Sequence, residues 1–179
     1  MEETAIDNGN FGKIYKGDFR GNLVAIKVLN QNNRLSNYRE LICLMECRSP
    51  NIVGLIGAGP CPTGKNLKFI VIEFARNSSL EHLRTARFEK RVGKPWQVEY
   101  TMSHTFLWFL HAANGLEYLH EHCNPPMIHR DIKPANMLLF DDCRSLKLCD
   151  FGTTREEDED VTSHQGSVRY MAPEVFERK

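Results

Sequence analysis

The 179-residue sequence lacks an excess of charge of either sign. Lysine plus arginine and aspartate plus glutamate each number 23, so the formal net charge is zero and the isoelectric point is near 7.0. No overall field therefore draws the chain to nucleic acid or to an anionic membrane. Trp96 and Trp108 have no basic context that would favour base stacking and are interpreted as packing residues. We expect no nucleic-acid partner.

The sequence also lacks a disulfide framework, a zinc motif and a membrane span. Its six cysteines are scattered without a C-x-x-C pair, which favours free thiols in a reducing compartment. The short cluster from His120 to Cys123 has no second ligand cluster, so it is interpreted as a helix end. There is no charged-then-apolar leader and no apolar run of membrane-spanning length, so we expect no membrane insertion and a cytoplasmic location.

Internal repeats and low-complexity tracts are absent too, whereas 41% of the residues are hydrophobic, enough to bury a core. The first half alternates like strands and contains one helical segment. Gly17 together with Arg20-Gly21-Asn22 is expected to supply the first turn. Leu35, Tyr38, Leu41, Ile42 and Met45 give the helix an apolar stripe. The expected elements are strands at Asn10–Lys16 and Leu23–Leu29, a helix at Arg34–Arg48, and strands at Ile52–Ala58 and Leu67–Phe74.

After Asn77-Ser78 the pattern changes from strands to helices. Ser79–Arg87 and His104–His122 have helical periodicity, and the second carries an apolar stripe. Two short strands, Met137–Phe140 and Leu146–Cys149, are expected to follow. This change near residue 77 predicts a hinge between two parts of the molecule.

The most informative stretch runs from His129-Arg130-Asp131 through Asn136 to Asp150-Phe151-Gly152. Asp131, Lys133 and Asn136 can converge on one site from a single loop, and Asp150 returns to it from a later turn. Phosphoryl transfer needs this set: a base for the attacking hydroxyl, oxygen ligands for Mg²⁺, and a cation for the moving phosphate. The pattern is long and fixed in spacing, which makes a chance match improbable.

Two upstream segments fit the same chemistry. Gly9 and Gly12 lie in a turn where backbone N–H groups can approach phosphate oxygens, although the segment alone would favour an ordinary hairpin turn. In Val24-Ala25-Ile26-Lys27, strand alternation places Ala25 and Lys27 on one face. The ion-pair partner of Lys27 is expected from the next helix, where Glu40 is preferred over Glu46 because Glu40 sits mid-helix.

These motifs together resemble the eukaryotic protein kinase family. The resemblance implies an α+β, bilobal protein kinase fold, with a β-rich N-lobe at residues 1–76 and the first part of a helical C-lobe at residues 77–179. In that family a further helical half of the C-lobe follows the Ala-Pro-Glu motif, which here is Ala172-Pro173-Glu174, so the C-lobe is expected to be incomplete in this chain. Asp7 departs from the family pattern, which places a glycine there.

The resemblance also implies a role for each motif residue, with ATP and Mg²⁺ as cofactors. Asp131, Lys133, Asn136 and Asp150 would be catalytic, and of these Asn136 and Asp150 would bind the metal. Ile72 would gate the adenine pocket, backbone groups of Glu73 and Ala75 would bond the adenine edge, and Leu138 would lie under the base. The full set expected at the nucleotide is Gly9, Gly12, Ile14, Ala25, Lys27, Glu40, Ile72, Glu73, Ala75 and Leu138.

Lys133 and Ser167 are typical of serine/threonine kinases, whereas tyrosine kinases usually carry Ala or Arg at the Lys133 position. Thr162 sits where related kinases carry a regulatory threonine, and Arg130 is its expected partner once phosphorylated. The alternative for this region is a solvated acidic loop, because Glu156 to Asp160 are all acidic.

Asp150-Phe151-Gly152-Thr153-Thr154 and the sequence around Ala172-Pro173-Glu174 further resemble the TGF-β-activated kinase branch of the MAP kinase kinase kinases. This resemblance implies a MAP kinase kinase as substrate, an activator or adaptor protein as partner, and a role in stress or immune signalling, including the JNK cascade. The alternative is a non-catalytic kinase-like module that binds nucleotide or a signalling partner. The complete set of motif residues favours the enzyme, whereas Asp7 and the missing C-lobe half favour the module.

Overall fold

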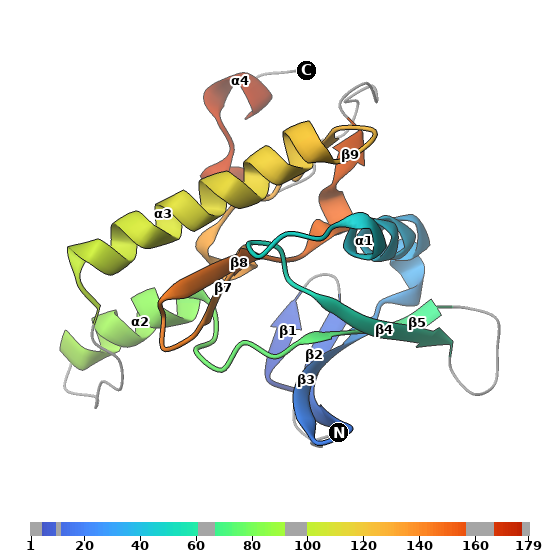
Figure 1. The fold of residues 1–179 in the computed structure, drawn as a ribbon, viewed down its shortest axis with the longest axis horizontal. Helices are drawn as coiled ribbons and strands as arrows, with labels where there is room; N and C mark the ends of the chain where they lie inside the picture. The colour runs from blue at the N-terminus through green and yellow to red at the C-terminus, as the bar shows by residue number, and fades with distance from the viewer. Residues whose placement is uncertain (1–4, 10–11, 61–66, 92–99, 157–166, 177–179) are drawn as a thin grey trace.

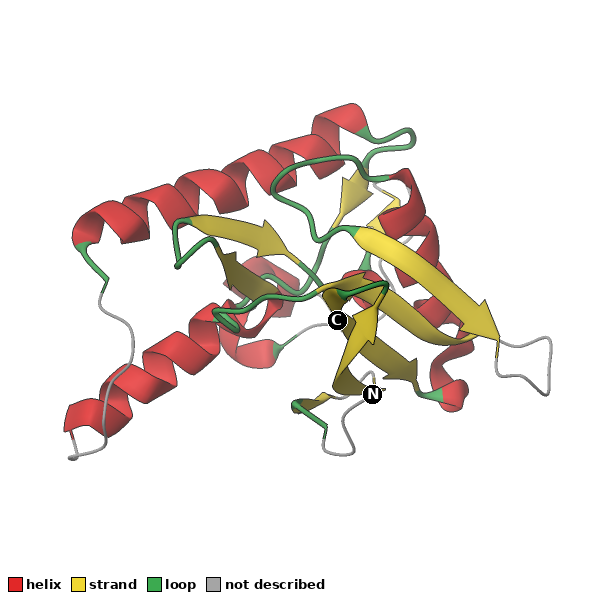
Figure 2. Cartoon of the chain, turned by 60° about the horizontal axis from the view of Figure 1, so that its bottom comes forward, coloured by secondary structure: helices red, strands yellow, loops and turns green. Residues whose placement is uncertain are grey.

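A computed structural model describes residues 5–9, 12–60, 67–91, 100–156 and 167–176 of the chain (Figure 1). The architecture is mixed α+β, with the largest sheet and one long helix in one part and two further long helices in the other. Figure 2 shows this separation, with two red helices on one side and most of the yellow strands on the other. In the described residues no helix is long and apolar enough to cross a membrane.

The first part is a five-stranded antiparallel sheet in the order β1-β2-β3-β5-β4. Its strands are β1 (Asp7–Gly9), β2 (Gly12–Phe19), β3 (Asn22–Leu29), β4 (Leu55–Pro60) and β5 (Leu67–Glu73). The β2–β3 turn lies at Arg20 and Gly21, both with positive φ, and the Gly21 N–H donates to Asp18 Oδ1. Gly17 was expected in this turn, which is wrong, because Gly17 lies inside β2 opposite Val24.

Helix α1 (Arg34–Glu46) packs beside this sheet, but the face it buries is not the one that its apolar stripe predicts. Asn37, Glu40, Cys43 and Leu44 are its buried residues. Of the predicted stripe only Leu41 packs against the core, while the other four residues are 46–63% exposed. Those four are Leu35, Tyr38, Ile42 and Met45. The helix turns Glu40 inward because Lys27 lies opposite, and a buried Glu40 carboxylate needs a cationic partner.

The second part contains α2 (Leu80–Arg91) and α3 (Met102–Glu117). A π-helical turn at Tyr118–His122 continues α3. Two short strand pairs and a last helical turn follow among the described residues: β6 (Met127–Ile128) with β9 (Arg155–Glu156), β7 (Met137–Phe140) with β8 (Ser145–Leu148), and α4 (Pro173–Phe176). Thr101 caps α3, and its N–H donates to His104 Nδ1.

A close contact between the segment after α1 and strand β8 joins the two parts. Leu148 N–H donates to the Asn51 carbonyl and Val53 N–H donates to the Leu148 carbonyl, so the two segments pair like strands. Gly115 on α3 makes this approach possible, because a Cβ there would lie 2.9 Å from Leu148 Cδ1 and 3.0 Å from the Asn51 carbonyl oxygen. One hydrophobic core therefore runs from the sheet through β8 to α3.

Candidate active site

The site begins on strand β3, where alternation places Ala25, Lys27 and Leu29 on one buried face. Antiparallel pairing sets Ile14 of β2 beside Lys27, and Ile72 of β5 beside Ala25. Lys27 thus lies between aliphatic neighbours on the strands and is only 6% exposed. A charge buried this deeply needs partners.

Two carboxylates from distant parts of the sequence supply them. Lys27 Nζ lies 2.7 Å from both carboxylate oxygens of Glu40 and 2.8 Å from Oδ1 of Asp150. Burial alone would lower the pKa of Lys27, but the two carboxylates outweigh it and raise that pKa above its ordinary value. The expected Lys27–Glu40 ion pair is therefore present, and Glu46 lies exposed on the other side of the helix.

Three donors surround the Asp131 carboxylate, two from the loop after β6 and one from Ser167. Lys133 Nζ donates to Asp131 Oδ2 at 2.6 Å and to Ser167 Oγ at 2.7 Å. The Ser167 N–H donates to Asp131 Oδ1 at 2.9 Å, and Asn136 Nδ2 donates to Asp131 Oδ2 at 3.0 Å. Burial of Asp131 favours its neutral form, but the hydrogen bonds from Lys133 and Ser167 outweigh it and lower its pKa. Asp131 is thus kept as an anion.

Asp150 reaches the same region from a strained turn. Its backbone is left-handed, with φ of 66°, and a 3₁₀ turn at Phe151–Thr153 follows at once. Two bonds fix this turn: Cys149 N–H donates to the Asn136 carbonyl, and Ser36 Oγ donates to the Gly152 carbonyl. The turn therefore ties the catalytic loop to α1 and directs the Asp150 carboxylate at Lys27.

Gly12 shows why the first hairpin requires glycine. Its φ is 142°, and a Cβ there would lie 2.1 Å from the Val28 carbonyl oxygen of the neighbouring strand. Gly9 pairs with Gly12 across β1 and β2, which brings the two backbones to the tip of the hairpin. Residues 10 and 11 of the glycine-rich turn lie outside the described part of the chain.

The oxygen donors fit a magnesium ion. Asn136 Nδ2 is committed to Asp131, so the amide turns its oxygen to the remaining side. Asp150 adds a carboxylate. Mg²⁺ is usually held by one or two such protein oxygens together with phosphates and water, rather than by a complete protein cage. Accordingly, no group of three or more His, Cys, Asp or Glu side chains that could hold a metal occurs among the described residues.

Comparison with known proteins decides the family. A family model described as "Protein kinase domain" matches residues 2–179. The chain is a protein kinase family member. It is similar to mitogen-activated protein kinase kinase kinase 7 of Drosophila melanogaster, with 34% identity over 173 residues, and to that of Homo sapiens, with 36% identity over 176 residues. A putative leucine-rich repeat receptor-like protein kinase of Arabidopsis thaliana is 33% identical over 181 residues.

These matches cover nearly all of this kinase but a small part of its relatives. The alignments include 96% of the chain for the Drosophila and Arabidopsis proteins and 98% for the human one. They include 24%, 19% and 27% of those proteins respectively. The chain thus spans about a quarter or less of the length of these curated relatives.

The Glu73 side chain at the end of β5 and the Ala75 carbonyl after it make contacts within the protein. Glu73 pairs with Lys147 through both carboxylate oxygens, at 2.7 and 2.8 Å, and accepts from the Gly54 N–H. The Ala75 carbonyl accepts from the Ser78 N–H, which shapes the turn towards α2. Leu138 is partly buried and forms an isolated antiparallel β-bridge with Ser79, so it lies beside the segment that follows Ala75.

His129 is a site residue to which sequence reasoning assigned no role. It is 1% exposed, its ring packs 5.0 Å from that of Phe151, and its carbonyl accepts from Thr153 Oγ1. The Asp131 N–H donates to Nδ1, so Nε2 carries the proton and donates to the Cys149 carbonyl. Burial lowers the pKa of this imidazole. A neutral His129 thus connects the Asp131 loop to the Asp150 turn, and only its position beside Asp131 in the sequence pointed to it.

Of the three residues expected to be regulatory, the structure describes Ser167 and Arg130. Ser167 contacts both Asp131 and Lys133. Arg130 precedes Asp131 with a left-handed backbone, φ 68°. Thr162 lies outside the described residues, as does most of the acidic run.

Proposed function

We propose that this kinase transfers the γ-phosphate of ATP to serine or threonine hydroxyls of a protein substrate. The observation that carries the proposal is the convergence on one region of an anionic Asp131, the Lys133–Ser167 contact and the Lys27–Asp150 pair. A base, a cation for the transferred group and an oxygen ligand set are the parts that such a reaction needs.

In this proposal each polar group has one task. Asp131 accepts the proton of the substrate hydroxyl or orients that hydroxyl, and its lowered pKa keeps it ready to do so. Lys133 neutralises charge on the transferred phosphoryl group. Asn136 and Asp150 hold Mg²⁺, which when bound supplies charge neutralisation between the phosphates.

The nucleotide would lie between the sheet and the catalytic loop. Lys27 contacts the α- and β-phosphates and is positioned by Glu40. Gly9 and Gly12 approach the phosphates, and the aliphatic side chains of Ile14, Ala25, Ile72 and Leu138 enclose the base, whose edge bonds the backbone of Glu73 and Ala75. The division into an N-lobe, residues 1–76, and a partial C-lobe, residues 77–179, belongs to this proposal.

The MAP kinase kinase kinase relatives support a more specific assignment. We infer a MAP kinase kinase as substrate, an activator or adaptor protein as partner, and a cytoplasmic place in a stress or immune cascade such as the one that leads to JNK. Phosphorylation of Thr162, with Arg130 as the partner of the phosphate, would switch the kinase on.

The test is phosphoryl transfer by the parent and by Asp131→Asn. The variant is expected to lose about 1,000-fold in turnover while nucleotide affinity stays unchanged, because a base is lost but no nucleotide contact. Asp142→Asn, an exposed aspartate in the β7–β8 turn, is the matched control and should keep parental turnover. Phosphoamino-acid analysis should return phosphoserine and phosphothreonine.

Two results would count against the proposal. Equal turnover of the parent and Asp131→Asn would remove the catalytic assignment. Tight nucleotide binding by a parent protein that transfers no phosphate to any protein would favour the alternative, a nucleotide-binding module without catalysis.

A further inference from the structure

Three cysteine thiols meet at a place that phosphoryl transfer does not use. Cys43 Sγ lies 3.7 Å from Cys47 Sγ, and Cys47 Sγ lies 3.8 Å from Cys123 Sγ. Cys43 and Cys47 come from the C-terminal end of α1, whereas Cys123 follows the π-helical turn after α3, 76 residues further along the chain. All three are free thiols. Cys47 is the central member of this cluster, in contact with both others.

The three thiols are not chemically equivalent. Hydrogen bonds from Cys43 and Cys123 favour the Cys47 thiolate, and they outweigh burial to lower its pKa. Its hydrogen bond to Cys47, together with burial, raises the pKa of Cys43, and burial raises that of Cys123 to about 12. Cys47 is therefore the nucleophile of the cluster, since the thiolate is the reactive form.

Exposure then separates the two neighbours of Cys47. Cys43 is 1% exposed and sits within the helix, whereas Cys123 is only partly buried on a segment outside it. Cys47 itself is 7% exposed and ends the helix with an extended backbone. Cys123 is thus the member of the cluster that is most open to solvent.

We propose that Cys47 and Cys123 form a reversible disulfide when the kinase meets hydrogen peroxide, and that this bond fastens the C-terminal end of α1 to the end of α3. The Cys47 thiolate attacks one peroxide oxygen, which gives a sulfenic acid and releases hydroxide. The Cys123 sulfur then attacks the Cys47 sulfur, the S–S bond forms and water leaves. Two thiols are oxidised and one peroxide is reduced to two waters. A cellular dithiol reverses the reaction.

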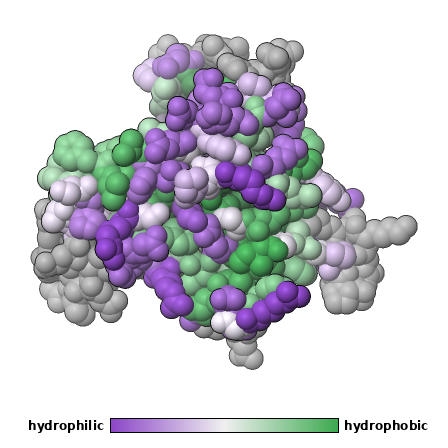
Figure 3. All heavy atoms as spheres, viewed as in Figure 1, coloured by the Kyte–Doolittle hydropathy of each residue, from purple (hydrophilic) through white to green (hydrophobic). Residues whose placement is uncertain are grey.

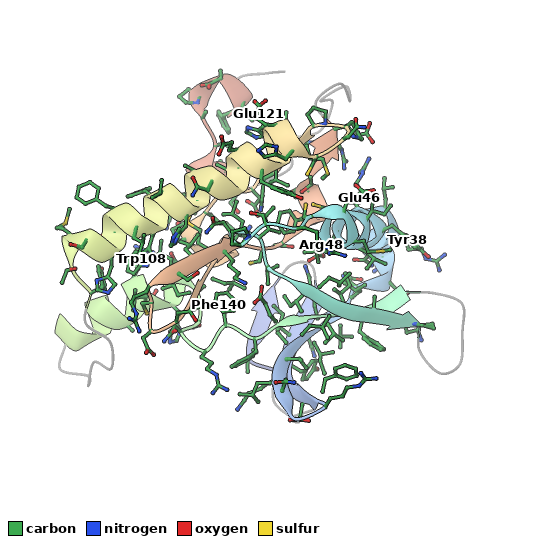
Figure 4. The ribbon with its side chains drawn as sticks, viewed as in Figure 1. Tyr38, Glu46, Arg48, Trp108, Glu121 and Phe140 are labelled. Atoms are coloured by element: carbon green, nitrogen blue, oxygen red, sulfur yellow. The ribbon has the colours of Figure 1, made fainter. Side chains whose placement is uncertain are left out.

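The place of the bond gives it consequences for the site. Arg48, the residue after Cys47, already donates its N–H to the Tyr118 hydroxyl at 2.9 Å, so the two segments are in contact before any oxidation. Figure 4 labels one residue or more of each segment: Glu46 and Arg48 at the end of α1, and Glu121 in the turn after α3. Glu40 lies on the same helix, so a bond that holds the end of α1 restricts the movement of Glu40 away from Lys27. The bond would thus favour the assembled site.

The experiment maps the disulfide in the full chain. The protein is exposed to hydrogen peroxide, remaining thiols are blocked, and unreduced peptides are identified by mass spectrometry. We expect a Cys47–Cys123 peptide pair that dithiothreitol abolishes, and a melting temperature roughly 10 °C above that of the reduced protein. Cys123→Ser should lose both effects, while Cys143→Ala, at a buried thiol outside the cluster, should keep them.

Amide hydrogen exchange in α1 gives a second readout that needs no kinase activity, and it should slow on oxidation. A bridge between Cys43 and Cys47, bridges scattered over all cysteine pairs as in an unfolded chain, or oxidation of Cys47 beyond the sulfenic acid without any bridge would each overturn the proposal. None of these outcomes depends on whether the protein transfers phosphate.

Discussion

Lys27 balances two carboxylates at once, Glu40 from α1 and Asp150 from the turn after β8. Such a group serves the fold as well as the site, because removing the cation leaves two acids close together away from water. Lys147 offers a natural contrast: it also pairs with a glutamate, Glu73, but both members of this pair are partly exposed. Replacing Lys27 should therefore lower the free energy of unfolding more than replacing Lys147.

Lys27→Met is expected to lower the free energy of unfolding by about 3–5 kcal/mol, because it leaves a buried acid unpaired. Lys147→Met is expected to cost no more than about 1 kcal/mol, since exposed pairs contribute little. Urea denaturation measures both. Lys27→Met/Glu40→Gln should recover part of the loss, because it removes one of the two unpaired charges. Equal losses for the two lysine variants would show that the Lys27 pairs do not stabilise the fold.

His129 predicts a dependence of stability on pH. Burial lowers its pKa below the ordinary 6.5, so the folded state keeps the imidazole neutral while the unfolded chain protonates it. The unfolded chain then binds more protons, and the free energy of unfolding should decline as pH falls below about 6.5. Denaturation at pH 7.5 and pH 5.5 measures the decline.

Nitrogen-detected NMR of the imidazole provides the direct check on His129. It should report a neutral ring with the proton on Nε2, because Nδ1 faces the Asp131 N–H. A proton on Nδ1 would displace that donor. A ring that becomes charged near its ordinary pKa would contradict both the burial and the bonding described for this residue.

At the scale of elements, the turn after β8 contains two adjacent buried threonines that differ in their bonding. Thr153 Oγ1 donates to the His129 carbonyl at 2.9 Å. Among the described residues, Thr154 Oγ1 is buried and has no hydrogen-bond partner. A buried hydroxyl without a hydrogen-bond partner destabilises the folded state, whereas a hydrogen-bonded one stabilises it.

The pair gives an experiment with an internal control. Thr153→Val should lower the free energy of unfolding by about 1–3 kcal/mol, because it leaves the His129 carbonyl unpaired. Thr154→Val keeps the shape, removes the unpaired hydroxyl, and is expected to be neutral or stabilising. Thermal and urea denaturation compare the two. If Thr154→Val were the more damaging variant, the assignment of these hydroxyls would be reversed.

Helix α1 shows a different balance at the same scale. Burial of Glu40 against Lys27 turns the helix, and the apolar residues Tyr38, Ile42 and Met45 are left facing outward. The buried ion pair, with 2.7 Å between Lys27 Nζ and Glu40 Oε1, constrains the rotation of α1 about its axis more strongly than a few apolar side chains do. The hydrophobic effect depends on the area buried and not on direction.

At the scale of the whole molecule, the outer face of α3 is apolar. Met102, Phe106, Phe109 and Leu110 are 67, 68, 69 and 55% exposed. Figure 3 shows hydrophobic surface at the left edge of the molecule, where Figure 1 places the beginning of α3. Trp108 points the other way, towards the β7–β8 hairpin, where its indole N–H donates to the Cys143 carbonyl at 2.6 Å (Figure 4).

We therefore expect the 179-residue chain to self-associate through α3. Phe106→Gln/Phe109→Gln should shift the population towards monomer and change the free energy of unfolding by no more than about 0.5 kcal/mol, since both rings are exposed. Trp108→Phe should leave association unchanged and cost about 1–3 kcal/mol, because it removes the indole donor. Light scattering and urea denaturation measure the two properties. Undiminished association of the double variant would place the contact elsewhere.

Short-range spacing made the chemistry predictable from the sequence. Asp131, Lys133 and Asn136 lie within one loop, so the chain cannot separate them, and Ala25 and Lys27 share a strand face because side chains alternate. The preference for Glu40 over Glu46 rested on a position within one helix. The order of the longer strands and helices followed from periodicity, with boundaries that shifted by a few residues, whereas the short strands β1, β6 and β9 were not predicted.

Tertiary structure alone decided the rest. Which face of α1 is buried depends on Lys27, 13 residues earlier, and the Lys27–Asp150 contact joins residues 123 positions apart. The thiol cluster likewise brings Cys47 to Cys123. Hydrophobic periodicity indicates how much apolar area the face of a helix or strand would bury. A buried charge or polar group also needs a partner, and the sequence does not indicate which distant residue that partner is. For that reason the sequence determined which groups this kinase has, and the fold decided which of them meet.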